Sequence, residues 1–287
     1  MPGRALRVHI LPDFGHLLLK DLRVDHANRL VAQLRKAGHV PKGINMILGV
    51  LLTLLNDAIE WQFLARNPLA RYKPVKEPEL HFDYWSATEV RQFLSATMFD
   101  PYQPLYIAAV NTGMRRGELC GLKWDRIDLA RNQITISRSL SRYGLSETTK
   151  SGKKRFVPIN AVMKALFLNM QKSVRGEYVF SESDGSPLDV HHMYRDFRAA
   201  QSRAGFSRLL RFHDLRHTFA SHFMMNDGNI YDLQKILGHS SLEMTQRYAH
   251  MSPDHLAKAI QVVSFAPDEL GENVISLEGK RIEKCLG

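Results

Sequence analysis

The chain has 287 residues, of which 44% are hydrophobic, so it is long enough for one large or two modest domains with buried cores. Its formal net charge of +10 indicates an acidic partner, although a basic surface that only keeps a protein soluble would have the same sign. No apolar run approaches the roughly 18 residues of a membrane span, the basic start leads into Pro12 and Asp13 rather than a signal-peptide core, and only two cysteines occur. We therefore expect a cytoplasmic protein with no membrane segment, no disulfide framework and no structural metal.

Residues 1–78 are predicted to form a helical domain. Apolar residues recur at helical intervals over residues 22–37 and again over residues 44–64, with a Gly38-His-Val-Pro41 breaker between the two runs. Several prolines then interrupt a charged stretch, and proline-rich polar sequence usually crosses between cores. We expect a linker at about residues 66–79, a second domain over residues 80–263 and a C-terminal tail over residues 264–287.

The second domain is also predicted to be helical, apart from one extended region. Residues 133–137 alternate polar and apolar side chains, and residues 155–159 follow a Ser151-Gly152 turn signal, which together predict a small antiparallel sheet. Ser86 and Glu89 have the spacing of a capping box that starts a helix. Further helices are predicted over residues 104–110, 161–171, 193–204, 215–225, 230–237 and 242–248. The predicted fold class is mainly α with a small antiparallel β-sheet, in two domains.

Two segments of the second domain combine basic side chains with turns. Over residues 111–119, an apolar helix stops at Gly113 and a new one starts, which brings Arg115 beside a helix N-terminus, where anions are favoured. Residues 149–155 form a cationic hairpin tip, and charge alone does not choose among Lys150, Lys153 and Lys154. Taken singly, an arginine after a glycine and a basic hairpin tip are ordinary surface features.

Two further segments carry histidines and a tyrosine. His213-Asp-Leu-Arg-His217 opens an amphipathic helix on which Arg216 is rotated away from the apolar positions, so it can point with His213 towards a site at the helix start. Over residues 237–250, a helix ends at Gly238, and a capping box of Ser240 and Glu243 is predicted to start another, with Tyr248 two turns into it.

Both segments also have simpler interpretations. The spacing of His213 and His217 imitates a metalloprotease motif, but Arg216 would repel a cation and no third ligand is evident. A tyrosine near a helix end is ordinarily a partly buried core residue with a hydrated hydroxyl.

Together, in this order and spacing, the four segments resemble the catalytic domain of the tyrosine recombinase, or phage integrase, family over about residues 80–262. Lys150 holds the family's lysine position relative to Arg155-Phe-Val-Pro158. Glu118 resembles the acidic residue that accompanies the first arginine. The catalytic set that the resemblance implies is Arg115, Lys150, His213, Arg216, His239 and Tyr248.

Phosphoryl-transfer chemistry agrees with this assignment. Guanidinium groups are permanently charged forks that match phosphate oxygens, so Arg115 and Arg216 can follow the charge of the transition state. Tyr248 needs activation, and we expect the two arginines to favour its phenolate while His213 receives or relays its proton. By resemblance, Lys150 is the general acid for the leaving 5′ oxygen, and His239 hydrogen-bonds the phosphate.

The resemblance implies site-specific recombination through a covalent 3′-phosphotyrosine and a Holliday junction. The covalent link keeps the phosphoester energy, so no cofactor is expected, and no phosphate-binding P-loop motif occurs. The implied partners are double-stranded DNA attachment sites, a homotetramer on that DNA and accessory DNA-bending proteins. Type IB topoisomerase-like strand cleavage and a catalytically silent DNA-binding module remain alternatives.

The first domain resembles the family's helical core-binding domain more loosely, through Asn56-Asp-Ala-Ile-Glu-Trp-Gln-Phe63 and Asn67-Pro68. We expect no separate arm-binding domain ahead of it. For the tail, docking on a neighbouring protomer and lack of order are both left open.

Overall fold

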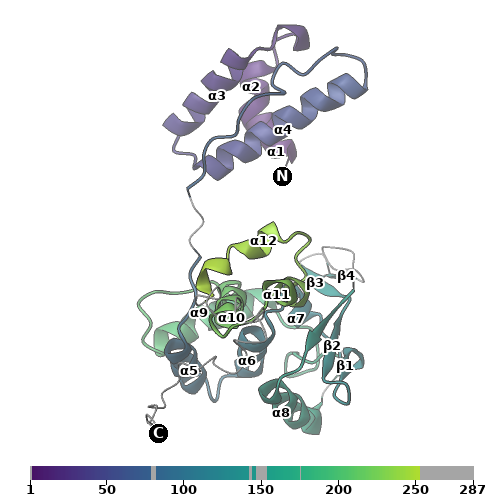
Figure 1. Ribbon diagram of the computed structural model, residues 1–287, viewed down its shortest axis with the longest axis vertical. Coiled ribbons are helices and arrows are strands. Elements are labelled where there is room, and N and C mark those ends of the chain that lie inside the picture. The colour runs from purple at the N-terminus through teal and green to yellow at the C-terminus, as the bar shows by residue number, and fades with distance from the viewer. Residues whose placement is uncertain (1, 79–81, 142–143, 147–153, 175, 253–287) are drawn as a thin grey trace, which may run out of the picture. The chain divides into compact units, whose positions relative to one another are not determined.

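The computed structural model describes residues 2–78, 82–141, 144–146, 154–174 and 176–252. Its contacts divide the chain into two compact units, Met1–His81 (unit 1) and Phe82–Gly287 (unit 2), which are described separately. Both consist mainly of helices, and unit 2 also contains short antiparallel strands (Figure 1). The predicted fold class, mainly α with a small antiparallel sheet, is confirmed.

Unit 1 is built on the two helices that the apolar runs predict, α3 (Val24–Lys36) and α4 (Pro41–Glu60). Pro41 starts α4 because its missing N–H and fixed φ suit the first helical turn. Leu30 of α3 and Ile44 and Leu55 of α4 are almost fully buried in a common core. Shorter elements precede these helices: α1 (Pro2–Ala5), a π-helical turn (Leu6–Ile10), α2 (Leu11–Phe14) and a 3-10 turn (Leu19–Asp21).

Within the part of the chain that the structure describes, α4 alone is long and apolar enough to cross a membrane, with a mean hydropathy of 1.4. Core helices of soluble proteins meet the same criterion. The apolar face of α4, including Ile47, Leu48 and Leu51, is buried in the core of unit 1. In the described part of the chain, 33% of this apolar window is buried inside unit 1.

The predicted linker packs on unit 1 over much of its length. Leu69 is 1% exposed and belongs to the unit 1 core. The Asn45 side chain accepts a hydrogen bond from the Val75 N–H at 2.8 Å and donates one to the Val75 carbonyl at 2.9 Å. The proline-rich polar stretch therefore packs on unit 1 as far as Val75.

Unit 2 contains a helical core. Its helices are α5 (Ala87–Ala96), α6 (Gln103–Thr112), α7 (Arg116–Cys120), α8 (Ala161–Met170), α9 (Val190–Arg203), α10 (Asp214–Met225), α11 (Ile230–Leu237) and α12 (Glu243–Gln246). Ser86 and Glu89 form the predicted capping box of α5. α10 packs against both α6 and α11 (Figure 1), so the ends of three helices that carry motif residues lie close together.

The predicted sheet is present beside these helices. β1 (Ile127–Asp128), β2 (Gln133–Ile136) and β5 (Arg155–Pro158) pair antiparallel in the order β1-β2-β5, with Ile134 opposite Val157. Ile134 and Ile136 are buried, as the alternation of β2 predicts. β3 (Ser139–Ser141) and β4 (Gly144–Ser146) form a separate antiparallel ribbon. The Ser151-Gly152 turn signal lies outside the described residues.

The predicted helix over residues 242–248 is shorter than expected. α12 ends at Gln246, and Tyr248 follows it as the residue before a 3-10 turn (Ala249–Met251), so its position two helical turns in was wrong. The capping box was also wrong, because the Ser240 hydroxyl contacts the Met244 sulfur at 3.5 Å instead of capping the helix. Thr245 and Tyr248, which lie on this short segment, are both buried.

Candidate active site

Glu118 is the centre of an ion-pair network that positions two arginines. Arg155 of β5 donates to both Glu118 carboxylate oxygens at 2.7 Å, and Arg115 donates to Oε1 at 3.0 Å. The Glu118 side chain also accepts from the Arg115 backbone N–H at 2.7 Å, which closes the N-terminus of α7. One carboxylate thus joins the start of α7 to the sheet.

Burial and ion pairing act in opposite directions on Glu118, which is 3% exposed. Burial alone would raise the pKa of Glu118, but hydrogen bonds and charge from Arg155, followed by Arg115, hold it below its ordinary value. The carboxylate is therefore ionised at neutral pH and keeps both guanidinium groups oriented.

Arg216 and Arg115 converge on one turn. Arg216 of α10 donates from Nη1 to the Gly113 carbonyl and from Nη2 to the Leu237 carbonyl, both at 2.7 Å. Arg115 donates from Nη2 to the carbonyl of Gly238, the next residue, at 3.2 Å. Gly113 and Gly238 both have positive φ and end α6 and α11, which is why their carbonyls are free to accept.

Arg216 is 4% exposed, whereas the side chain of Arg115 is 26% exposed. Burial, followed by the positive charge of Arg115, lowers the pKa of Arg216 to about 9, so it stays protonated at neutral pH. Arg115 and Arg216 together form an electropositive site at the ends of α6 and α11. An anion such as a phosphate would neutralise this charge.

Two predicted histidines lie in the field of these arginines. His239 follows Gly238, and its Nδ1 lies 2.8 Å from the Thr245 hydroxyl. Burial, followed by the charges of Arg216 and Arg115, lowers the pKa of His239 to about 3. His213 stands at the start of α10, and partial burial followed by the charge of Arg216 lowers its pKa as well. Both imidazoles are neutral at pH 7.

Tyr248 lies beside these residues but is buried, with 1% of its surface exposed. Its hydroxyl is 2.6 Å from Nδ1 of His217, and its ring meets the Phe82 ring edge-on at 4.9 Å. Burial raises the pKa of Tyr248, and the opposing charges of Arg216 and Arg247 do not compensate. In this conformation burial therefore disfavours the phenolate that the two arginines were expected to favour.

The contact expected between His213 and the tyrosine proton is made by His217 instead. His213 meets His217 edge-on at 5.3 Å between ring centroids. Burial, followed by the influence of His213, lowers the pKa of His217 to about 4, so its ring is neutral. Nothing in the described ranges groups three or more His, Cys, Asp or Glu side chains as a metal site.

The geometry thus brings together Arg115, Glu118, His213, Arg216 and His239, with Tyr248 adjacent. Lys150 lies outside the described residues. Sequence reasoning missed Arg155 and the role of His217. A signal existed for His217, which lies one helical turn after His213 in the quoted motif. Arg155 had no such signal, because only the fold brings it to the buried Glu118.

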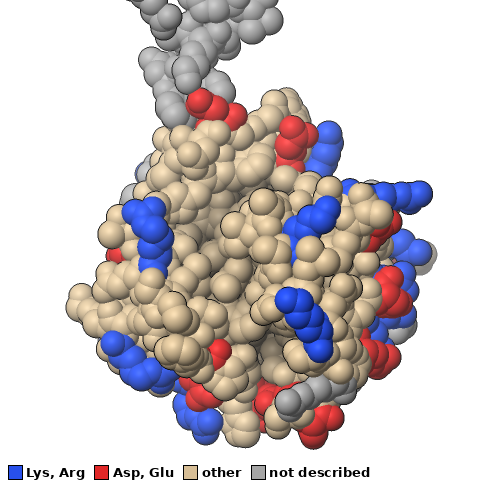
Figure 2. Space-filling model, turned by 90° about the horizontal axis from the view of Figure 1, so that it is seen from below, with Lys and Arg blue, Asp and Glu red and all other residues tan. Residues whose placement is uncertain are grey.

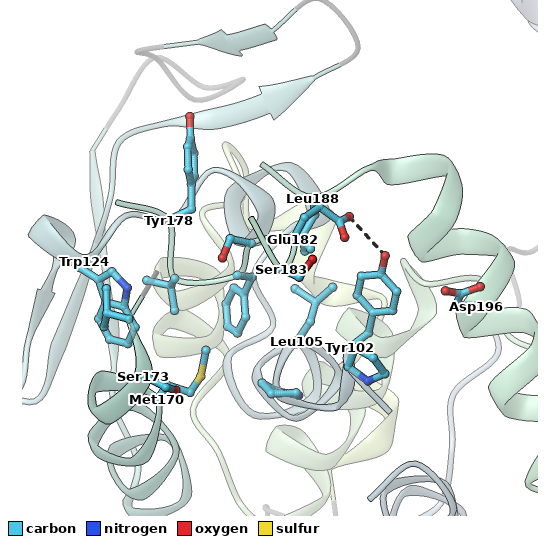
Figure 3. Close-up of a pocket in the computed structure, with 16 residues that line it drawn as sticks. Tyr102, Leu105, Trp124, Met170, Ser173, Tyr178, Glu182, Ser183, Leu188 and Asp196 are labelled. Carbon is cyan, nitrogen blue, oxygen red and sulfur yellow. Dashed lines mark hydrogen bonds between the residues drawn. The ribbon is translucent and has the colours of Figure 1, made fainter. Parts of the chain in front are cut away.

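A cavity of about 500 Å³ lies elsewhere in unit 2 and includes none of the predicted catalytic residues. Figure 3 shows its lining, where the Tyr102 hydroxyl donates to Glu182 at 3.3 Å among apolar side chains such as Leu105 and Leu188. Burial and the nearby Glu182 carboxylate raise the pKa of Tyr102 to about 12.

Figure 2 shows one face of unit 2 on which basic and acidic side chains are interspersed around an uncharged centre. The convergent arginines therefore mark the site more clearly than this cavity or the charges on that face.

Comparison with known proteins agrees with this arrangement. Residues 90–255 match the Phage integrase family, so the chain belongs to the phage integrase family. It is 32% identical over 230 residues to the integrase of Escherichia phage 186, an alignment that covers 77% of this chain and 60% of that protein. It is 24% identical over 282 residues to a XerC-like tyrosine recombinase of Caldanaerobacter subterraneus subsp. tengcongensis, covering 86% of this chain and 71% of that protein.

Solved structures of similar fold include two integrases bound to DNA. The Tn1549 transposon integrase in complex with a circular intermediate DNA has a TM-score of 0.77 at 20% identity, covering 91% of this chain and 92% of that chain. A λ integrase (residues 75–356) dimer bound to a COC′ core site has a TM-score of 0.66 at 20% identity, covering 85% and 86% of the two chains. At this level of identity the likeness establishes the fold.

Proposed function

We propose that the chain is a site-specific DNA recombinase that cleaves and rejoins strands through a covalent 3′-phosphotyrosine at Tyr248 and a Holliday junction. The observation that carries the proposal is the convergence of Arg115 and Arg216 on the neighbouring carbonyls of Gly238 and Leu237. This turn also carries His239 and leads through α12 to Tyr248. A phosphate at this turn would be held by both guanidinium groups, and the turn is separated from Tyr248 by only a short stretch of chain.

Each residue has a role in the proposed reaction. Arg115 and Arg216 stabilise the charge on the non-bridging phosphate oxygens. His239 hydrogen-bonds the phosphate, and His213 receives or relays a proton. Tyr248 gives up this proton from its hydroxyl and attacks phosphorus, which forms the phosphotyrosine bond and breaks the bond to the 5′ oxygen. The leaving oxygen takes a proton, for which Lys150 is the proposed donor. Reversal by another strand's 5′ hydroxyl completes joining without ATP or metal.

Glu118 and Arg155 support this site from behind. Their pairing fixes Arg115 against α7 and connects it to β5, the strand that follows Lys150 in the sequence. We propose that unit 2 is the catalytic domain and that unit 1 is the core-binding domain. Exposed arginines on α3 and at the end of unit 1, among them Arg29, Arg35 and Arg71, are available for phosphate contacts.

The proposed partners are double-stranded attachment sites and three further copies of the chain, with accessory DNA-bending proteins. A λ integrase tetramer bound to a Holliday junction has a similar fold, with a TM-score of 0.65. The proposed location is the cytoplasm, in association with DNA.

A covalent capture experiment tests the function. The protein is incubated with a pool of duplexes that carry randomised core sequences and a nick that traps cleaved product, and adducts are separated on a denaturing gel. Wild type should form an adduct that Tyr248→Phe abolishes and Tyr231→Phe, altered at an exposed tyrosine, retains. An adduct that survives in Tyr248→Phe would contradict the proposal. Captured sequences that are relaxed in a plasmid but not resolved as Holliday junctions would identify a topoisomerase instead.

A further inference from the structure

The Tyr248 hydroxyl is buried and hydrogen-bonded in this structure, whereas an attacking nucleophile has to meet its phosphate directly. An attacking oxygen must approach within about 3–3.5 Å of its target in line with the leaving group. The Tyr248 side chain is 1% exposed, and its hydroxyl is hydrogen-bonded to His217 rather than to Arg115 or Arg216. A phosphate at the arginines therefore has no access to the hydroxyl until the side chain moves.

Two side chains hold Tyr248 in this place. His217 provides Nδ1 at 2.6 Å from the hydroxyl, and Phe82 stacks on the His217 ring at a centroid distance of 4.9 Å and an interplanar angle of 22°. Phe82 also meets the Tyr248 ring edge-on at 4.9 Å. Phe82 is the first residue of unit 2, whereas His217 and Tyr248 come from α10 and the segment after α12.

The electrostatics of the three rings favour this conformation for a protonated tyrosine. Burial lowers the pKa of His217 to about 4, so the ring is neutral and can accept a hydrogen bond from the phenol. Burial raises the pKa of Tyr248, so the phenol keeps its proton while it stays there. In this buried position Tyr248 is therefore a protonated phenol, which is a poor nucleophile.

We propose that His217 and Phe82 are positioning residues that hold Tyr248 in a resting conformation and that DNA cleavage requires them to release its side chain. This inference rests on the proposed role of Tyr248 as the nucleophile. The hydrogen bond and the ring contacts are separable. Phenylalanine at position 217 keeps an aromatic ring on Phe82 but removes Nδ1, whereas asparagine places a polar atom near the Nδ1 position and loses the ring.

Nitration by tetranitromethane, measured for each tyrosine by peptide mass spectrometry, tests the resting conformation in the absence of DNA. Tyr231 is 57% exposed and serves as the internal reference. In wild type, Tyr248 should be nitrated far more slowly than Tyr231. The His217→Phe variant should increase the ratio of Tyr248 to Tyr231 nitration about two- to tenfold, the equilibrium equivalent of one hydrogen bond. His217→Asn should restore much of the protection, and Phe82→Ala should lose it.

Matched controls are His191→Phe and Phe99→Ala, which alter an exposed histidine on α9 and a phenylalanine that is 95% exposed. Both should keep the wild-type nitration ratio. If wild-type Tyr248 were nitrated as fast as Tyr231, or if neither His217→Phe nor Phe82→Ala changed the ratio, the resting conformation would be refuted.

Adduct formation with the captured duplex tests the release step. His217→Phe and Phe82→Ala should form the covalent adduct at least as fast as wild type, because less energy is needed to free Tyr248. Loss of the adduct in a folded His217→Phe variant would overturn the proposal, since His217 would then be needed in the reaction itself. If wild type itself forms no adduct with any duplex, the proposed function fails while the nitration result still decides the resting conformation.

Discussion

Arg155 and Glu118 are joined by two parallel hydrogen bonds of 2.7 Å, with the side chains 9% and 2% exposed. Arg155 also donates from Nε to the Ile236 carbonyl at 2.9 Å. This pair therefore connects β5, α7 and the end of α11. A buried pair of this kind is costly to break on one side only, because the remaining charge has no partner.

Glu118→Ala is expected to lower the free energy of unfolding of unit 2 by about 3–5 kcal/mol, since Arg155 would be left buried and unpaired. Urea unfolding followed by circular dichroism measures the loss. Arg131→Gln is the control, because the Arg131–Asp128 pair has side chains 82% and 47% exposed and should contribute less than about 1 kcal/mol. Equal effects of the two substitutions would show that the Glu118 network does not stabilise the site.

Gly238→Ala is expected to displace the side chains of Arg155, which lies against Gly238, and Arg115, which donates to its carbonyl. Gly238 has a φ of +65°, and a Cβ there would lie 2.6 Å from Cδ of Arg155. Gly205 has a φ of +81° with nothing within 4 Å of an added Cβ, so Gly205→Ala measures backbone strain alone, about 1 kcal/mol. Gly238→Ala should be more destabilising than Gly205→Ala and should also reduce covalent adduct formation. An equal loss of stability with unchanged adduct formation would contradict the close approach of Arg155.

Arg216→Lys keeps the charge but replaces the planar fork that joins the Gly113 and Leu237 carbonyls. We expect the rate of adduct formation to fall about 100- to 1000-fold, as for other groups that stabilise transition-state charge. Single-turnover cleavage under saturating protein measures the rate, and a gel-shift assay should show that DNA binding is largely kept. Arg208→Lys, at an exposed arginine paired with Asp83, should leave the rate unchanged. Wild-type cleavage by Arg216→Lys would remove this residue from the proposed site.

Stability should fall on mild acidification. The pKa of His217 is lowered to about 4 and that of His239 to about 3, both below the ordinary value of 6.5. Between these values the unfolded chain binds more protons than the folded one, so the full stability is present above pH 6.5 and is lost as pH falls. Each ring should contribute a slope of about 1.4 kcal/mol per pH unit.

Urea unfolding at pH 7.0 and pH 5.5 measures this slope, and His217→Asn should lose one ring's share of it. A free energy of unfolding that is flat or rises over this interval would show that the two rings are not held neutral in the folded protein.

The local elements of this fold follow from local patterns. Helical spacing predicted α3, α4, α6, α8, α9, α10 and α11, and alternation of Ile134 and Ile136 predicted β2. The start of a helix after Gly113 was readable from neighbouring residues and placed Arg115 at its N-terminus. Arg216 was placed on an amphipathic helix by its neighbours, and the family resemblance joined the two arginines in one site.

The contacts between distant segments were not predictable in the same way. Phe82 and His217 are brought together by packing, and no periodicity connects them. Arg155 was one of several basic residues near a hairpin, and only the folded position of Glu118 distinguishes it. Tyr248 was expected in a continuous helix, but burial of its ring against Phe82 and His217 accompanies an early end to α12.

The central claim is that Tyr248 forms the covalent bond with DNA, and peptide mapping tests it most directly. The protein–DNA adduct from the capture experiment is digested with nuclease and protease. The peptide that carries the remaining nucleotide is then sequenced by tandem mass spectrometry. We predict that the nucleotide is attached through its 3′ phosphate to Tyr248, within the segment that follows α12. Attachment to another residue such as Tyr194 or Tyr231, or through a 5′ phosphate, would contradict the proposed mechanism.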